Sequence, residues 1–364
     1  DFCFVMRTGA FYNHQHMDQG SFWFSDHGVN FIEERKGSAY YDDPLYQSWF
    51  IQPVSHSTIL INGNHQSQRI GDELKFAPGF EDHAFISQSL DGKDAAFSSG
   101  DIGRLYWGKV KSLTRSVLYL KPRTLLMLDV AIPDTLDADV TLLYQSGNLK
   151  DIDVGEHISK ITKRGFTLNI IHLAPKIITA KAVETPHYLN TLINERPLIK
   201  EGMLSVTART KGTPLVMANL LTTTPKGIAP SVTSETGKGF VKGVASGKKF
   251  AFNTIPGSLY NVENMETDAK ALTWSDTRVF VAVATTFRKK GFLIFKSNIP
   301  VTFELYGDSL KYDCDKAFKL TIGVKSMPSS IILNGLPVKN FIYNEQTKEV
   351  KIESPKGESI IIIK

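Results

Sequence analysis

The stretch FYNHQHMDQGSFWF, residues 11–24, gathers the side chains most able to do chemistry. In a strand, successive side chains point to opposite faces, so His14, His16 and Asp18 would share one face. Two imidazoles and a carboxylate that converge can bind a metal ion such as zinc. The alternative is a polar strand edge whose histidines hydrogen-bond to their neighbours, because HxHxD is short enough to arise by chance.

More polar and aromatic side chains follow. Glu33 and Glu34 end an apolar run, and His56 precedes the apolar segment ILING. Aromatic faces stack on sugar rings and guanidinium groups pair with carboxylates or sulfates, so a glycan cleft is one interpretation. The other is that the aromatics belong to the core and the arginines are surface charges. The residues in question are Tyr40, Tyr41, Tyr46, Trp49, Phe50, Arg104, Arg115 and Arg123.

Short β-type segments must position these side chains. Runs of branched and aromatic residues alternate with Gly, Pro, Asn and Asp turns, and no apolar stripe at helical spacing persists. This pattern predicts an all-β fold, with a large antiparallel sandwich over residues 1–286 and a small β-sandwich domain over residues 287–364. We expect a long surface excursion over residues 64–104, a hairpin or flexible connection over residues 224–248, and a tight hairpin turn at Asn334-Gly335.

The composition narrows the function classes. The net charge of +5 suits an anionic partner, but Lys and Arg are scattered rather than grouped as in nucleic-acid-binding proteins, and a basic surface that aids solubility is the alternative. Cys3 and Cys314 form no CxxC motif, so we expect two isolated thiols. No apolar run reaches the roughly 20 residues of a membrane span. The first residues lack the order of a signal peptide, and we expect an upstream segment that is not included.

The succession of motifs resembles the signature of the heparinase II/III-like polysaccharide lyases. In that family an HxHxD element is followed by SF, a Gly turn and apolar residues that run into an acidic residue; a later His-Asn-Thr element leads into a strand. The corresponding stretches here are residues 14–18, the Gly28 turn with residues 31–34, and residues 56–58. The stretch RSVLYLKPRTLLMLDVA looks like the family's basic-apolar run ending in Asp. The resemblance covers residues 8–130, and departs from the family in Ser57 for Asn and in Glu for Asp.

The resemblance implies one structural zinc ion held by His16, Glu34 and His56, with Glu33 as a competitor for Glu34. Asp18 would then orient an imidazole. His14 would face the substrate as a catalytic residue, although a buried histidine that supports the metal strand is the alternative. The fold that the resemblance implies is a β super-sandwich preceded by an (α/α) helical toroid, which supplies most of the catalytic groups and is missing from these residues.

The implied function is β-elimination in an acidic, uronate-containing polysaccharide, with this chain as the zinc-bearing wall of the cleft and inactive by itself. Such a bacterial protein would be periplasmic or secreted, and its partner would be an acidic polysaccharide or oligosaccharide rather than nucleic acid or a membrane. The uronate polymer stays open. One rival is a non-catalytic carbohydrate-binding or scaffold region of the same fold. A second is a zinc hydrolase, which the lack of an HExxH pattern disfavours.

Overall fold

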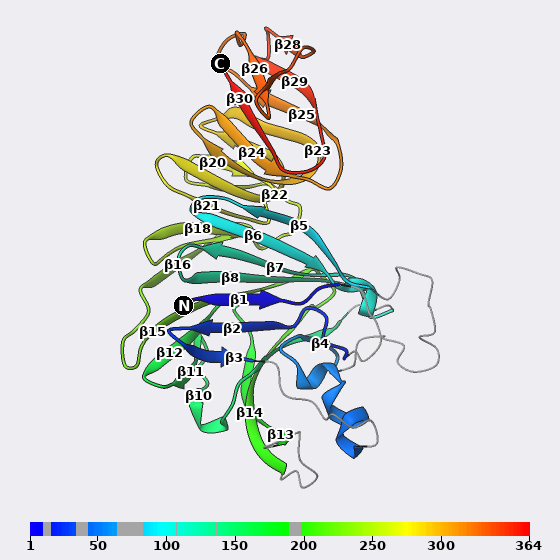
Figure 1. Ribbon diagram of the computed structural model, residues 1–364, viewed down its shortest axis with the longest axis vertical. Helices are drawn as coiled ribbons and strands as arrows, with labels where there is room; N and C mark the ends of the chain where they lie inside the picture. Colours follow the sequence, from blue (N-terminus) through cyan, green and yellow to red (C-terminus); the bar gives the residue numbers. More distant parts are fainter. Residues whose placement is uncertain (10–15, 34–42, 64–82, 107, 135–136, 189–197) are drawn as a thin grey trace. The chain divides into compact units, whose positions relative to one another are not determined.

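The computed structural model describes residues 1–9, 16–33, 43–63, 83–106, 108–134, 137–188 and 198–364. Nearly all of its regular structure is β strand in large antiparallel sheets, which confirms the predicted all-β class (Figure 1). Within the described residues the helical segments are short: η1 Tyr46–Phe50, η2 Pro53–Ser55, η5 Gly103–Tyr106 and η6 Leu149–Asp151. Within these ranges no helix has the length and apolar character needed to cross a membrane.

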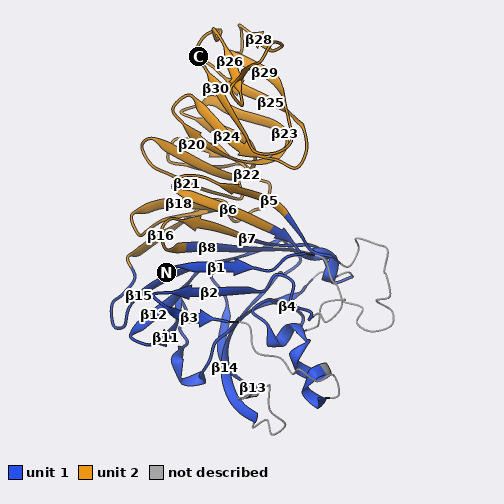
Figure 2. Ribbon diagram, in the orientation of Figure 1, with its two compact units in different colours: residues 1–86, 100–116, 125–230 blue, residues 87–99, 117–124, 231–364 orange. Residues whose placement is uncertain are grey.

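The chain divides into two compact units (Figure 2). Unit 1 comprises residues 1–86, 100–116 and 125–230, and unit 2 comprises residues 87–99, 117–124 and 231–364. The boundary expected between residues 286 and 287 falls inside strand β22, Arg278–Lys289, which pairs with β23, Phe292–Tyr306. The polar residues that suggested a boundary form the turn between these strands, where Lys290 and Gly291 have φ of 52° and 80°, as a tight hairpin requires.

Unit 1 holds two smaller sheets in full. The three-stranded sheet has the order β1-β2-β3, with β1 Cys3–Met6, β2 Phe22–Asp26 and β3 Val29–Ile32. The four-stranded sheet has the order β13-β14-β9-β4, with β13 Thr179–Tyr188, β14 Leu198–Arg209, β9 Asp139–Gln145 and β4 Ile59–Ile61. These two sheets supply the strands next to the histidine-bearing segments.

An eight-stranded sheet has the order β10-β11-β12-β15-β8-β7-β6-β5. The strands are β10 Ile152–Asp153, β11 Ile158–Lys163, β12 Phe166–Ala174, β15 Leu215–Pro225, β8 Thr124–Pro133, β7 Val110–Leu120, β6 Ala95–Asp101 and β5 Phe85–Asp91. Nine of the ten residues of β8 are buried, so both of its faces lie in the interior. The division between the units passes through β5, β6, β7 and β8.

The expected surface excursion over residues 64–104 is wrong for its second half, and residues 64–82 lie outside the described residues. Strands β5 and β6 form there and are joined by a turn in which the Gly92 N–H donates to Ala95 O at 2.9 Å. Leu90, Ala95 and Phe97 are buried, so a few apolar side chains secure a hairpin within a sequence rich in Ser, Gly and Asp. The expected hairpin within residues 224–248 is confirmed by β16 and β17.

Unit 2 contains a fifteen-stranded sheet with the main order β16-β17-β18-β21-β22-β23-β24-β30-β26-β27. The strands not yet given are β16 Val232–Gly237, β17 Phe240–Ala245, β18 Lys248–Asn253, β19 Tyr260–Val262, β20 Met265–Thr267, β21 Ala271–Trp274, β24 Ser309–Asp313, β25 Phe318–Gly323, β26 Ile331–Leu333, β27 Leu336–Pro337, β28 Ile342–Asn344, β29 Glu349–Ser354 and β30 Ser359–Ile363. Asn334 and Gly335 form the predicted tight turn, with φ of 51° and 81°.

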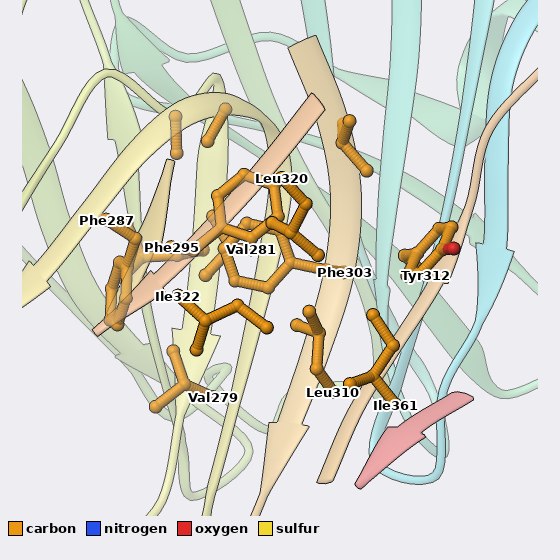
Figure 3. Packing of buried hydrophobic residues seen from close by; sticks show 14 of the residues in the cluster. Val279, Val281, Phe287, Phe295, Phe303, Leu310, Tyr312, Leu320, Ile322 and Ile361 are labelled. Atoms are coloured by element: carbon orange, nitrogen blue, oxygen red, sulfur yellow. The ribbon is translucent and has the colours of Figure 1, made fainter. Parts of the chain in front are cut away.

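The core of unit 2 follows from strand alternation. In β25 every second residue is buried, and its partner β29 places Ile352 opposite Leu320 and Val350 opposite Ile322. Phe303 stacks on Phe295 with ring centroids 4.1 Å apart, at the centre of the cluster in Figure 3. Apolar side chains therefore meet on one side of the strands, where burial removes their surface from water.

Candidate functional site

His16 and His56 lie together in unit 1, although forty positions separate them in the sequence. Their ring centroids are 5.1 Å apart, with the ring planes tilted by 50°. His16 is half-buried and lies in the loop before β2, whereas His56 is buried and follows η2. The structure therefore brings together two of the three residues predicted to bind a metal ion.

The loop at residues 16–20 differs from the predicted strand. Residues 18–21 form a turn in which the Ser21 N–H donates to Asp18 O at 2.9 Å, and Gly20 has a φ of 76°. The carboxylate of Asp18 forms an ion pair with Arg7. A turn that closes on itself and needs a positive φ cannot continue a strand, so the alternation argument does not apply to this segment.

The backbone around His56 determines how its ring is protonated. Nε2 lies 3.1 Å from the carbonyl oxygen of Phe50, and a carbonyl oxygen only accepts hydrogen bonds. Nε2 therefore carries the hydrogen, and in the neutral ring Nδ1 carries the lone pair. Histidines that bind metal ions commonly donate their other ring N–H to a carbonyl in this way.

Direct contacts hold the two histidine segments against each other. The Thr58 hydroxyl donates to the carbonyl of Gln19 at 2.6 Å, and the Met17 N–H donates to the carbonyl of Ile51 at 2.8 Å. Gln145, at the end of β9, donates its backbone N–H to the Ser57 hydroxyl at 2.9 Å. The loop before β2 and the segment after η2 are thus fixed to each other and to the four-stranded sheet.

Arg115 forms hydrogen bonds with the backbone of both histidine segments. Its side chain is fully buried and forms two hydrogen bonds with the carboxylate of Asp129, from Nε at 2.7 Å and from Nη2 at 3.3 Å. Its Nη1 donates to Gly20 O at 2.6 Å and to Ser57 O at 3.0 Å. One buried cation therefore joins both histidine segments. The sequence had suggested a surface charge or a sugar contact for Arg115, and both interpretations are wrong.

The other residues predicted for the site are Glu34, its competitor Glu33, and His14. Glu34 and His14 lie outside the described residues. Glu33, the competitor for Glu34, is half-exposed, and its Oε1 lies 3.4 Å from Lys163 Nζ. Among the residues that the structure describes, no group of three or more His, Cys, Asp and Glu side chains is placed to hold a metal ion.

The aromatic residues near the site are mainly packing elements in the described part of the chain. Tyr46 and Phe50 are buried, and Tyr46 meets His16 edge to face with centroids 6.4 Å apart. Burial raises the pKa of Tyr46, so its hydroxyl stays protonated near neutral pH. Tyr46 is therefore suited to donate a hydrogen bond rather than to act as a base. Tyr40 and Tyr41 lie outside the described residues.

The sequence matches a family model described as heparinase II/III-like, C-terminal, over residues 1–209, which is more than half of the chain. The chain belongs to the heparinase II/III-like family. The predicted resemblance is thereby confirmed, and the matched residues include both histidine segments, Arg115 and Asp129. The chain is accordingly a region related to polysaccharide lyases. No curated protein matches the sequence.

Several solved structures share the fold. The heparan sulfate lyase HepC from Pedobacter heparinus is 16% identical with a TM-score of 0.56, over 68% of this chain and 38% of that protein. A heparinase III gives 12% identity and a TM-score of 0.52 over 67% of this chain and 36% of its own. A heparinase III-BT4657 gene product gives 11% identity and a TM-score of 0.53, over 84% of this chain and 39% of that protein. This chain thus covers less than two fifths of each of these proteins.

Proposed function

We propose that this chain is the zinc-bearing β region of a polysaccharide lyase that cleaves an acidic, uronate-containing glycan by β-elimination. The observation that carries the proposal is the convergence of His16 and His56 within the residues that match the heparinase II/III-like family. A uronate glycan is proposed because HepC, which shares the fold, is described as a heparan sulfate lyase. The proposed location is the periplasm or the extracellular space of a bacterium.

The geometry of the two rings supports a shared zinc ion. With zinc–nitrogen bonds of about 2.0–2.1 Å in tetrahedral geometry, two imidazole centroids lie about 5 Å apart. The separation of 5.1 Å between His16 and His56 agrees with this value. The lone pair on Nδ1 of His56 suits it as the binding nitrogen. For the third ligand we propose Glu34, because the carboxylate of its competitor Glu33 is directed to Lys163.

Such a zinc ion would have a structural role. It would join the loop before β2, the residues after β3 and the segment after η2, and its binding free energy would add to the stability of unit 1. The elimination itself removes the proton at C5 of the uronate and expels the oxygen at C4, which requires a base, an acid and a group that neutralises the carboxylate. We propose His14 as the contribution of this chain and assign the other groups to an upstream region.

Elemental analysis tests the metal centre. Protein purified without added metal should contain about one zinc per chain. His16→Ala and His56→Ala should each remove most of the zinc and lower the melting temperature. His157→Ala, at an exposed position, should leave the zinc content and the melting temperature unchanged. Glu34→Gln should lose zinc and Glu33→Gln should keep it. If both histidine variants keep their zinc and their melting temperature, the proposed centre is wrong.

Cleavage assays test the activity separately. A longer protein that contains this chain and its upstream region should form unsaturated uronate ends from an acidic glycan, and this chain alone should not. His14→Ala in the longer protein should lower kcat and leave the zinc content unchanged. A longer protein that binds the glycan and never cleaves it would instead support the non-catalytic scaffold. Robust cleavage by this chain alone would show that the catalytic groups lie within these residues.

A further inference from the structure

A pocket of about 510 Å³ lies in unit 1, and the proposed zinc centre does not use it. Two hairpin turns and one helical turn form its walls. Gly28 belongs to the turn between β2 and β3, and Arg164 to the turn between β11 and β12, while Lys150 lies in η6. A volume of this size is typical of sites for small ligands, which occupy about 300–1,000 Å³.

Five of the eleven lining residues are charged. Lys150, Lys163 and Arg164 are cationic, and Glu33 and Asp151 are acidic. Lys163 and Glu33 form an ion pair at 3.4 Å, so their charges largely offset each other. Within the described part of the chain, neither Lys150 nor Arg164 pairs with a carboxylate, and both are exposed. The pocket therefore offers two cations to a ligand that enters it.

The remaining polar groups suit a sugar. Asp151 accepts a hydrogen bond from the Asn148 side chain at 3.3 Å, which leaves the carboxylate further lone pairs for a hydroxyl group. The amides of Asn30 and Asn148 each provide a donor and an acceptor beside the cations. A ring that carries both hydroxyl groups and a carboxylate or sulfate would satisfy acceptors and cations together.

Two of the walls are hairpin turns of defined geometry. Arg164 and Gly165 have φ of 48° and 82°, and His27 and Gly28 have φ of 52° and 70°, values that define tight two-residue hairpin turns. Lys163 is further fixed by donating to the carbonyl of Asn30 at 2.8 Å and to that of Phe31 at 3.3 Å. A site that is ordered in advance loses less conformational entropy when it binds.

We propose that this pocket binds one anionic sugar unit of the acidic glycan, with Lys150 and Arg164 pairing with its carboxylate or sulfate and Asp151 accepting from a hydroxyl. The inference rests on the proposed function for the class of ligand, and it adds the residues that select that ligand. The predicted contacts are electrostatic and partly exposed, so binding should weaken as salt is added.

Calorimetric titration of the whole chain with a heparan-type tetrasaccharide tests the pocket, and the same tetrasaccharide with reduced carboxyl groups and removed sulfates is the neutral probe. The double variant Lys150→Gln/Arg164→Gln should weaken binding of the acidic probe about tenfold, as expected for the loss of two exposed charge contacts. The matched control Lys238→Gln/Lys339→Gln removes two exposed cations from unit 2 and should change the affinity less than twofold.

A second variant blocks the pocket without changing its charges. A Cβ placed on Gly147 would lie 3.7 Å from Lys163 Nζ, an ordinary van der Waals contact, and no positive φ restricts this residue. Gly147→Leu should therefore fold normally and lose binding of the acidic probe, with an unchanged melting temperature. If this variant proves unstable, the charge variant, whose side chains are exposed, still provides the test.

Each outcome bears on the pocket in a distinct way. Weaker binding in the charge variant and in Gly147→Leu, but not in the control, supports it. Equal affinity in the wild-type chain and the charge variant overturns it and leaves the proposed lyase function standing. A wild-type chain that binds the neutral probe as tightly as the acidic one overturns the selection of an anion. The proposed lyase function is tested separately: it is wrong if the longer protein with its upstream region does not cleave an acidic glycan, whatever the binding titrations show.

Discussion

Replacing Arg115 by Met should strongly destabilise unit 1. The side chains of Arg115 and Asp129 are both fully buried, so removing the guanidinium leaves a carboxylate in the interior without its cation. It also removes the donor that the carbonyls of Gly20 and Ser57 share. Met fills a volume similar to that of Arg, so lost packing contributes little. The loss of stability in Arg115→Met therefore measures the polar contacts of the guanidinium.

The size of the effect follows from these contacts. Breaking a buried ion pair by removing one partner costs about 3–5 kcal/mol. Each carbonyl left without a donor costs up to about 1–3 kcal/mol more, although neighbouring terms do not add fully. Because whole domains are stable by only about 5–15 kcal/mol, Arg115→Met should leave unit 1 marginally folded. The double variant Arg115→Met/Asp129→Leu removes both charges and should be less destabilised than Arg115→Met alone.

Hydrogen exchange in increasing urea, read from peptides of β9, measures the free energy of unfolding of unit 1 separately from unit 2. Arg209→Gln is the matched control, because Arg209 pairs with Asp137 and Asp139 but its side chain is 55% exposed. The control should cost less than about 1 kcal/mol. A loss below about 1 kcal/mol for Arg115→Met, with the fold intact, would refute the role assigned to this residue.

Two further predictions concern packing and pH. Phe303 is fully buried and stacked on Phe295, so Phe303→Ala should lower the stability of unit 2 by about 3–5 kcal/mol. Phe292→Ala, at a 75% exposed position on the same strand, should change it by less than about 0.5 kcal/mol, and equal losses in urea denaturation would contradict this packing. Burial lowers the pKa of His172, and the hydrogen bond from its Nδ1 to Asn219 Oδ1 opposes this shift only in part, so the unfolded chain binds a proton there more readily than the folded chain. Stability should therefore fall as the pH drops below about 6.5, and His172→Gln should flatten this part of the profile; superimposable profiles would show that His172 is not responsible.

Local features of the fold follow from neighbouring residues, whereas pairings between distant segments do not. Runs of branched and aromatic residues between turn residues predict the all-β class, and Asn334-Gly335 predicts the tight turn between β26 and β27, because strand preference and backbone φ depend on neighbouring residues. The low apolar content of residues 85–101 wrongly predicted a surface excursion, because a few buried apolar side chains are enough to hold a hairpin there. The polar turn at Lys290-Gly291 resembled a domain boundary, because a linker and a tight turn use the same residue types.

For the candidate site, the sequence by itself determined which residue types are present and, through the order of the motifs, which family they indicate. The tertiary structure decided that His16 and His56 meet, that Glu33 is directed to Lys163, and that Arg115 is buried rather than exposed. The physical reason is that burial and partner choice depend on strand pairing between distant segments. Arg115 is stable in the interior because Asp129, fourteen residues later, and two carbonyls from separate loops surround its guanidinium.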